Sequence, residues 1–406
     1  MRLIIIAVGT HGDVAPLVGL GVGLQAAGHD VAFAAHPLFE DLVTGCGLEY
    51  LYMAPGFDFD PDNPRQHEAE LSDWVHTLRV LSRGVIDAVR DQPADALLTG
   101  MAVELASFSL AELKSIPVIG LRFFPTGDFG HGPMDPRAAA AGHAVRAELG
   151  LPEIGTAELE SRFRESEKFV LYGFSAHVIQ LPPDWPPDRL VAGYWWTPRP
   201  LGWEPPAALT EFLAAGPPPV FIGFGSTTDG VEHRADLSAI VAAALRRAGV
   251  RGIVQSGWLR LDVEDADVLT IGNVPHDWLF PRMAAVVHHC GAGTTAAGLR
   301  AGVPAVAIPG GVDQPYWAQR LLDLGVSPRT IPLRDLTADA LADALRAATT
   351  DPELRANAAR LGALIDSEDG IGTSVKAIEA HLAADQSDSV ANVFSSNSND
   401  SRRLGM

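Results

Sequence analysis

Apolar residues in this chain alternate between short continuous runs and helical spacings. A run at residues 3–8 is followed by an amphipathic stretch at 14–27, then Gly28 and a second run at 31–35. Buried parallel strands read as continuous apolar runs, and an amphipathic helix that stops at glycine suits the connection between two of them. The opening pattern therefore predicts a βαβ unit.

The same alternation of strands and helices continues through most of the chain. Further strands are expected at residues 48–52, 96–99, 117–121, 252–255, 268–271, 284–288 and 304–308, and helices of the second half at 236–248, 294–301, 316–324, 338–348 and 353–364. Strands that alternate with helices form parallel sheets with helices on both faces. We expect an α/β protein with doubly wound parallel sheets.

Proline clusters between residues 182 and 219 interrupt this alternation, and the pattern then starts again. Residues 219–226 repeat the order of residues 3–10, an apolar strand followed by a turn of small residues. A stiff, proline-rich connector is typical of a domain boundary. The expected organisation is two Rossmann-like domains at 1–198 and 219–384, a linker at 199–218, and a disordered polar tail at 385–406.

Composition narrows the possible partners. The 406 residues include 50 Asp and Glu against 30 Lys and Arg, a formal net charge of -20 that repels nucleic acid and anionic membranes. No apolar stretch approaches the roughly 20 residues that cross a bilayer. The two cysteines lie far apart in the sequence, so we expect a soluble cytoplasmic protein. Any anionic ligand would be held by local backbone amides and helix ends.

The segment at residues 284–298 has the sequence of such an anion site. A buried strand leads into a turn of tiny residues at 291–293, and the next helix opens with Thr294 and Thr295. Amides at a helix N-terminus attract an anion, and glycine lets a diphosphate approach the backbone. The threonine hydroxyls and the ring of His289 can add hydrogen-bond donors.

Two other interpretations of this turn stay open. The glycines can simply tighten a strand-to-helix turn around core histidines. The turn is also similar to the dinucleotide fingerprint, with Asp313 as its acidic residue. That fingerprint normally follows the first strand of a domain, whereas this turn lies several strands into the second half.

Several short motifs resemble, in the same order, those of a known enzyme family. They are Gly9-Thr10-His11-Gly12-Asp13 with Pro16, then Val274-Pro275-His276, the run from His289 to Thr294, Pro309 and Asp313-Gln314-Pro315. Together they look like the signature of family 1 glycosyltransferases, closest to the bacterial branch that decorates glycopeptide and other antibiotics and to the sterol glucosyltransferases. The resemblance implies the GT-B fold, in which two Rossmann-like domains face each other across a cleft.

The resemblance also implies roles for the matched residues. The diphosphate would be held by the turn from His289 to Thr295, and the nucleoside base by the backbone of Val274. Asp313 and Gln314 would bind sugar hydroxyls, with helix capping as the alternative for Asp313. The donor-binding candidates are Ser226, Val274, His289, Gly291, Ala292, Gly293, Thr294, Asp313 and Gln314. Plant members carry a ribose-binding Glu where this chain has Ala297, so the ribose contact stays open.

The catalytic base is expected in the first half, because the acceptor hydroxyl must lose a proton as it attacks the anomeric carbon. Asp13 follows the first strand, at the place where many relatives carry a catalytic histidine. Burial beside an apolar acceptor would raise its pKa towards a useful value. His11 is the second candidate, and helix capping is the alternative role of Asp13.

Two long irregular segments, at residues 55–76 and 122–141, are expected to bind the acceptor, since loops of this length usually carry function. Their side chains could line a pocket for a greasy aglycone, with core packing as the alternative; the candidates are Phe57, Trp74, Phe124 and His131. Asp58-Phe59-Asp60 and Asp265-Ala266-Asp267 have the spacing of metal-dependent transferases, but both lie in acidic, loop-like runs. No metal site is expected.

The sequence thus predicts a metal-independent, inverting glycosyltransferase that needs no cofactor. It would move a sugar from a UDP- or TDP-sugar to a hydroxyl of a small lipophilic or natural-product acceptor, as a monomer or homodimer. Two alternatives stay open: a catalytically silent helper of the same fold, and an enzyme that acts on the nucleotide sugar alone, as an epimerase does.

Overall fold

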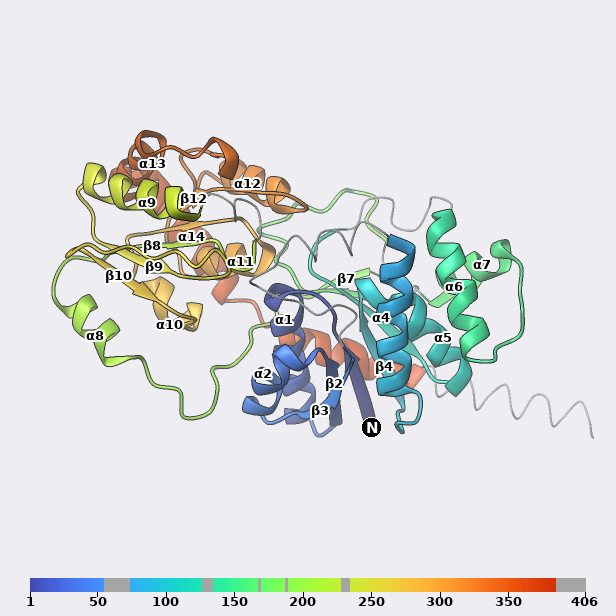
Figure 1. Cartoon of the computed structure of the whole chain (residues 1–406). Coiled ribbons are helices and arrows are strands. Elements are labelled where there is room, and N and C mark those ends of the chain that lie inside the picture. Colours follow the sequence, from blue (N-terminus) through green and yellow to red (C-terminus); the bar gives the residue numbers. More distant parts are fainter. Residues whose placement is uncertain (55–73, 126–133, 167–168, 187–188, 228–233, 385–406) are drawn as a thin grey trace, which may run out of the picture.

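The computed structural model describes residues 1–54, 74–125, 134–166, 169–186, 189–227 and 234–384. Two parallel sheets form the centres of two α/β domains that lie side by side (Figure 1). In the described residues, the strands of the first sheet are, in spatial order, β3 (Glu49–Tyr52), β2 (Asp30–Ala35), β1 (Arg2–Ile6), β4 (Ala96–Gly100), β5 (Val118–Arg122), β6 (Val170–Tyr172) and β7 (Arg189–Val191). Those of the second are β10 (Val268–Ile271), β9 (Gly252–Gln255), β8 (Val220–Gly223), β11 (Ala285–His288) and β12 (Ala305–Ala307). The predicted fold class is confirmed.

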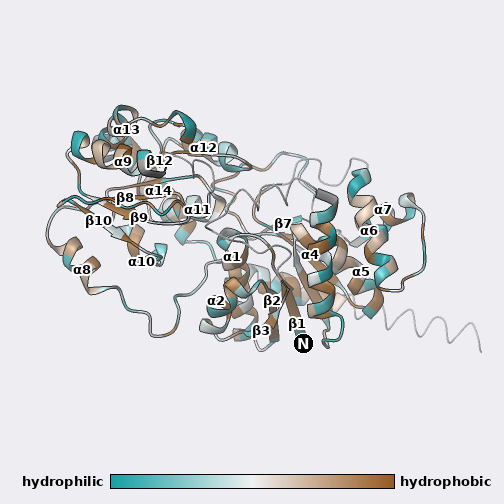
Figure 2. Ribbon diagram, viewed as in Figure 1, coloured by the Kyte–Doolittle hydropathy of each residue, from teal (hydrophilic) through white to brown (hydrophobic). Residues whose placement is uncertain are grey.

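Strand β1 lies inside the first sheet, with β2 and β4 as its neighbours. Ile4 is in register with Ala32 on one side and with Leu97 on the other. One face of the sheet packs against α1 (His11–Ala26) and α2 (Glu40–Gly45). The other face packs against α4 (Trp74–Val89), α5 (Glu104–Lys114), α6 (Pro136–Glu148) and α7 (Thr156–Ser166). Cover on both faces explains why these strands read as unbroken apolar runs, and Figure 2 shows them as hydrophobic ribbons.

The second sheet is built in the same way around β8 and β11. One face packs against α9 (Arg234–Ala248) and α13 (Ala338–Thr350). On the other side lie α8 (Ala207–Ala214), α10 (His276–Leu279), α11 (Ala292–Arg300), α12 (Gln314–Asp323) and α14 (Pro352–Asp366). In both sheets the strand order changes direction beside the first strand of the domain. Ligands of such folds bind at the carboxyl ends of the strands near this point.

A helix at residues 370–384 returns to the first domain (Figure 1). Its Val375, Ile378 and Leu382 lie in the apolar core beneath the first sheet. Trp195 donates from Nε1 to Ser374 Oγ over 2.7 Å. These residues fall in the range 219–384 that the sequence assigns to the second domain, yet their apolar side chains complete the core of the first.

Two further features differ from the sequence-based expectations. Strands β6 and β7, of three residues each, were not predicted from the sequence. Helix α8 lies within the expected linker at 199–218.

Cys290 is buried, whereas Cys46 is only partly buried, and both are free thiols. Among the described helices, none has both the length and the apolar character needed to cross a membrane.

Candidate active site

The first turn of α1 fixes the position of Asp13. Gly9, at φ +135°, precedes the turn, and a Cβ at this position would collide with the Asp13 carboxylate. Asp13 Oδ2 accepts hydrogen bonds from Thr10 N at 2.7 Å and from Thr10 Oγ1 at 3.1 Å. Thr10 is therefore the N-cap, and Asp13 binds back to it from the third helical position. Neither bond uses Oδ1.

Two influences from the protein raise the pKa of Asp13. The larger is loss of hydration beneath the surrounding protein, and the smaller is the negative charge of Asp313; the bonds from Thr10 act in the opposite direction. Asp313 belongs to the second domain. The two carboxylates are therefore within electrostatic reach of each other from opposite domains.

Across from α1, the strand-to-helix turn that follows β11 surrounds His289 with small residues. Cys290 has φ +64°, which is unusual for a residue with a side chain. A Cβ on Gly225 would lie 2.7 Å from His289 Cε1, and one on Gly291 would lie 2.5 Å from His289 Nε2. A side chain at either position would therefore collide with the imidazole in its present place.

His289 is buried with part of its hydrogen-bonding capacity unused. Its side chain is 8% exposed, and Nδ1 has no partner in the described residues. Burial lowers its pKa to about 4. The neighbouring His288 is a core residue, with burial lowering its pKa to about 3 and Nδ1 accepting from Cys290 N at 3.1 Å. The two adjacent histidines therefore differ, and His289 is the one placed at the turn.

The N-terminus of α11 is open in the way that an anion site requires. Its N-cap is Gly291, so no side chain caps the first amides. Thr295 is 1% exposed, and its Oγ1 has no partner among the described residues. Thr294 is partly exposed in the same turn. Sequence and structure thus agree on an uncapped helix start lined by hydroxyls.

The two helix N-termini meet where the domains adjoin. A Cβ on Gly293 at the start of α11 would lie 3.6 Å from the Cα of Gly12 in the first turn of α1. Figure 1 shows α1 and α11 at the junction of the domains. The structure therefore brings the candidate base and the candidate diphosphate turn together, although they are about 280 residues apart in sequence.

Asp313 and Gln314 lie at the start of α12, after a strained loop. Val312 has φ +58° and is 99% exposed, which is rare for a β-branched residue. Gln314 Oε1 accepts from Gly310 N at 2.8 Å. Asp313 is at the N-cap position but makes no capping bond; instead Trp317 Nε1 donates to its Oδ2 at 2.9 Å. These bonds fix both side chains beside the domain junction.

The remaining donor candidates lie at the carboxyl edge of the second sheet. Ser226 follows Gly225 in the turn after β8 and is partly exposed. Val274 is 8% exposed and packs in the core, so only its backbone can serve a ligand. Trp258 was not predicted from the sequence. Its backbone N–H donates a hydrogen bond to Gly225 O at 3.1 Å, which places Trp258 beside the same turn.

The acceptor candidates are only partly within the described residues. Phe57, His131 and the Asp58-Phe59-Asp60 motif lie outside them. Trp74 is the first residue of α4, and Phe124 follows β5, where it packs against the core beside the second domain. For Phe124, core packing is therefore the role that the contacts support.

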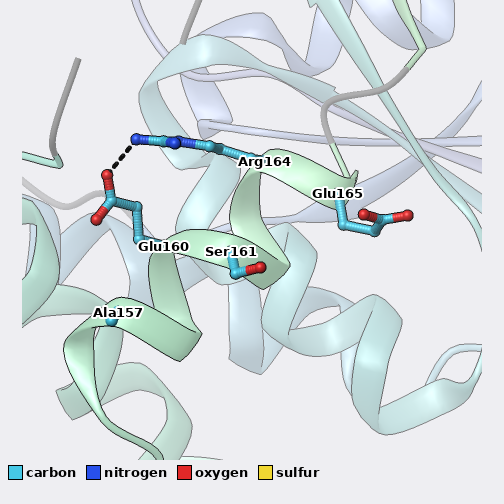
Figure 3. Close-up of a pocket in the computed structure, with 5 residues that line it drawn as sticks. All are labelled: Ala157, Glu160, Ser161, Arg164 and Glu165. Carbon is cyan, nitrogen blue, oxygen red and sulfur yellow. Dashed lines mark hydrogen bonds and ion pairs between the residues drawn. The ribbon is translucent and has the colours of Figure 1, made fainter. Parts of the chain in front are cut away.

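Two further features lie apart from the domain junction. In the other Asp-x-Asp motif, Asp265 pairs with Arg246 at 3.0 Å, as expected of a solvated turn. Figure 3 shows a surface hollow on α7, where Glu160 and Arg164 form an ion pair. The described residues include no group of three or more His, Cys, Asp or Glu that could hold a metal ion.

Known families match both halves of the chain. Residues 3–90 match the glycosyltransferase family 28 N-terminal domain, and residues 261–370 match the erythromycin biosynthesis protein CIII-like C-terminal domain. The chain is 33% identical to the O-mycaminosyltylonolide 6-deoxyallosyltransferase of Streptomyces fradiae, over 93% of the chain and 97% of that protein. The chain belongs to this family of glycosyltransferases.

Other relatives of this glycosyltransferase are longer. It is 32% identical to a sterol 3-beta-glucosyltransferase of Arabidopsis thaliana, over 94% of the chain but only 66% of the relative. Among solved structures, it superimposes on the kitacinnamycin glycotransferase with a TM-score of 0.71 and 21% identity, over 94% and 99% of the two chains. It superimposes on the glycosyltransferase VinC in complex with dTDP with a TM-score of 0.68 and 20% identity, over 95% and 100%. Both structures share the GT-B fold.

Proposed function

We propose that this glycosyltransferase moves a sugar from a nucleoside diphosphate to a hydroxyl of a lipophilic acceptor, with inversion at the anomeric carbon. The observation that carries the proposal is the meeting of α1 and α11. Gly12 adjoins Gly293, and the negative charge of Asp313 in the opposite domain raises the pKa of Asp13. A base on one side of a leaving diphosphate on the other is the arrangement that in-line displacement needs.

The second domain would bind the donor. The diphosphate would accept hydrogen bonds from the α11 amides and from the side chains of Thr294, Thr295 and His289. Within the described residues, neither Thr295 Oγ1 nor His289 Nδ1 has a hydrogen-bond partner. The helix dipole and these donors would stabilise the charge that develops on the leaving group, so we propose that no metal ion is required. Asp313 and Gln314 would bind sugar hydroxyls.

The nucleoside would lie along the carboxyl edge of the second sheet. Three residues follow the adjacent strands β8, β9 and β10 there: Ser226, Trp258 and Val274, of which Val274 would contribute its backbone. An indole at this edge would offer a flat surface for a nucleobase. Solved relatives include VinC in complex with dTDP and a spinosyn rhamnosyltransferase in complex with thymidine diphosphate. Thymidine and uridine diphosphates are therefore the donors to test first.

Asp13 would act as the base. Its raised pKa suits proton abstraction better than that of an ordinary aspartate. Asp13 is also the α1 residue that lies near Asp313, the proposed ligand of the sugar. Relatives named for sterol and tylonolide substrates suggest a rigid, largely apolar acceptor with a free hydroxyl.

The decisive experiment measures donor binding and sugar transfer separately. Thermal shift and calorimetry with UDP, TDP and their sugars identify the donor, and transfer is then assayed on a sterol and a macrolactone after chelation of metals. Asp13→Asn should lower kcat at least about 100-fold, because it removes the base. It should leave nucleoside diphosphate affinity within about twofold, because the donor turn is intact.

Asp351→Asn, at the N-cap of α14 and outside the proposed site, is the matched control and should keep full activity. Unchanged turnover in Asp13→Asn would remove Asp13 from the proposal. Binding of a donor without transfer to any acceptor would favour the helper hypothesis, and isomerisation of the sugar without an acceptor would favour an epimerase.

A further inference from the structure

The first turn of α1 carries two titratable side chains that face different groups of the second domain. The charge of Asp13 is coupled to that of Asp313. The charge of His11 is instead coupled to that of His276, the first residue of α10. Residues two apart on a helix point in nearly opposite directions. The first turn of α1 therefore lies near both Asp313 and His276 of the second domain.

His276 connects the His11 side of the junction with the diphosphate turn. Burial lowers the pKa of His276 to about 3, and the charges of His11 and His289 act in the same direction. Its ring stacks on Phe280, with the ring centres 4.2 Å apart. His276 is thus held as a neutral, packed imidazole, with His11 and His289 as its titratable neighbours.

Backbone packing supports the same placement. Gly12, the residue after His11, adjoins Gly293 at the start of α11. The ring of His289 lies against Gly225 and Gly291 in the turns that follow β8 and β11. His11 is the most exposed of the three coupled histidines, so it is the one that can exchange a proton with water.

We propose that His11 contacts the departing diphosphate from the first domain, opposite His289. The proposal rests on the donor site described above and adds to it a leaving-group residue from the acceptor-binding domain. It also separates the two candidate bases, since Asp13 would serve the acceptor and His11 the leaving group.

The chemistry of the site supports this role. Partial loss of hydration lowers the pKa of His11, although the residue stays exposed to water. The titratable group that His11 faces across the junction is His276, which is in turn affected by His289. Asp13 lies on the same turn as His11 and is affected by Asp313 of the second domain. A bound diphosphate would favour the imidazolium, which would take its proton from water. The resulting cation would offset leaving-group charge in a chain of net charge -20.

Two substitutions with opposite electrostatic consequences test the proposal by calorimetry. His11→Gln keeps a hydrogen-bonding side chain without a charge, and His11→Arg supplies a permanent one. His143→Gln is the control, on α6 of the same domain, where His143 bonds Thr156 Oγ1. Each protein is titrated with UDP and TDP, and with uridine and thymidine.

We expect His11→Gln to weaken binding of the preferred diphosphate about tenfold while leaving nucleoside affinity within about twofold. His11→Arg should restore diphosphate affinity, and His143→Gln should match the wild type. Wild-type diphosphate affinity in His11→Gln, or an equal loss for nucleoside and diphosphate, would overturn the role of His11. If the wild-type protein binds neither diphosphate, the proposed function itself fails, which is a separate result.

Discussion

Asp13 lies among groups that act on its pKa in opposite directions. Loss of hydration and the charge of Asp313 raise the pKa, and the hydrogen bonds from Thr10 lower it. A carboxylate works as a base only when it is deprotonated, so activity should rise as the pH passes upward through the pKa of Asp13. The bonds to Thr10 hold the carboxylate in place while burial keeps it basic.

Removing the charge of Asp313 should therefore shift the acidic limb of the pH profile. In Asp313→Asn the pKa of Asp13 should fall, because a nearby negative charge no longer opposes ionisation. The residual kcat should then reach its plateau at a lower pH than in the wild type. The measurement is kcat against pH at saturating donor, supported by carbon NMR titration of the Asp13 carboxyl.

Asp323→Asn, at the far end of α12, is the control, because Asp323 is exposed and pairs with Arg320. Its profile should match that of the wild type. A profile for Asp313→Asn that keeps the wild-type midpoint, or moves to higher pH, would contradict the coupling between the two carboxylates.

The sequence was informative about site residues wherever the relevant geometry is local. A strand, a glycine turn and a helix start are contiguous at His289 to Thr295, so an anion site could be predicted there. Trp258 could not be found in this way, because its place beside Gly225 depends on two adjacent strands. The coupling of His11 with His276 joins two domains, and no spacing in the sequence records it.

Helix α1 illustrates how an element can be predicted while its packing is not. The helical spacing of its apolar residues was readable, but the role of its internal glycines was not. A Cβ on Gly19 would lie 2.6 Å from the carbonyl oxygen of Trp196, and one on Gly23 would collide with Ile371. Both glycines thus let distant backbone and the helix at 370–384 pack closely against α1.

Gly19→Ala should destabilise the protein, although alanine favours helices. The added methyl group meets backbone that cannot rotate away, and such overpacking typically costs about 1–3 kcal/mol. The measurement is the free energy of unfolding in urea. Gly298→Ala in α11 is the matched control, because a Cβ there meets nothing within 4 Å. That variant should be neutral or more stable by up to about 1 kcal/mol. Equal effects in the two variants would contradict the close approach at Gly19.

The strands of four residues or more were predictable, because each forms a continuous apolar run. Residues 252–255 and 268–271 coincide with β9 and β10. Strands β6 and β7 and helix α8, which lies in the proline-rich segment, were not predicted. These elements are stabilised by neighbouring strands and by core side chains that are distant in sequence.

At the scale of the whole molecule, the chain crosses between the domains more than once. It leaves the first domain through residues 192–206 and returns to it with the helix at 370–384. On the return, Ser175 Oγ donates to Glu368 Oε1 at 2.8 Å, and Trp195 Nε1 donates to Ser374 Oγ. Linear boundaries in the sequence therefore do not coincide with the two hydrophobic cores.

Because the helix at 370–384 packs in the first domain, the stability of that domain should depend on it. Ile378 is 0% exposed in the core beneath the first sheet. Ile378→Ala should lower stability by about 2–4 kcal/mol, through lost apolar contact and the cavity that it leaves. Lys376→Ala, at an exposed position on the same helix, should change stability by less than about 0.5 kcal/mol.

Native-state hydrogen exchange locates the effect of Ile378→Ala. If the helix belongs to the first cooperative unit, amides of β1, β2 and β4 should lose protection while those of β8 and β11 keep it. Loss of protection confined to β8 and β11 would instead assign the helix to the second domain. Because the proposed mechanism holds Asp13 on α1, against which this helix packs, the first outcome should also weaken transfer at temperatures where donor binding is still intact.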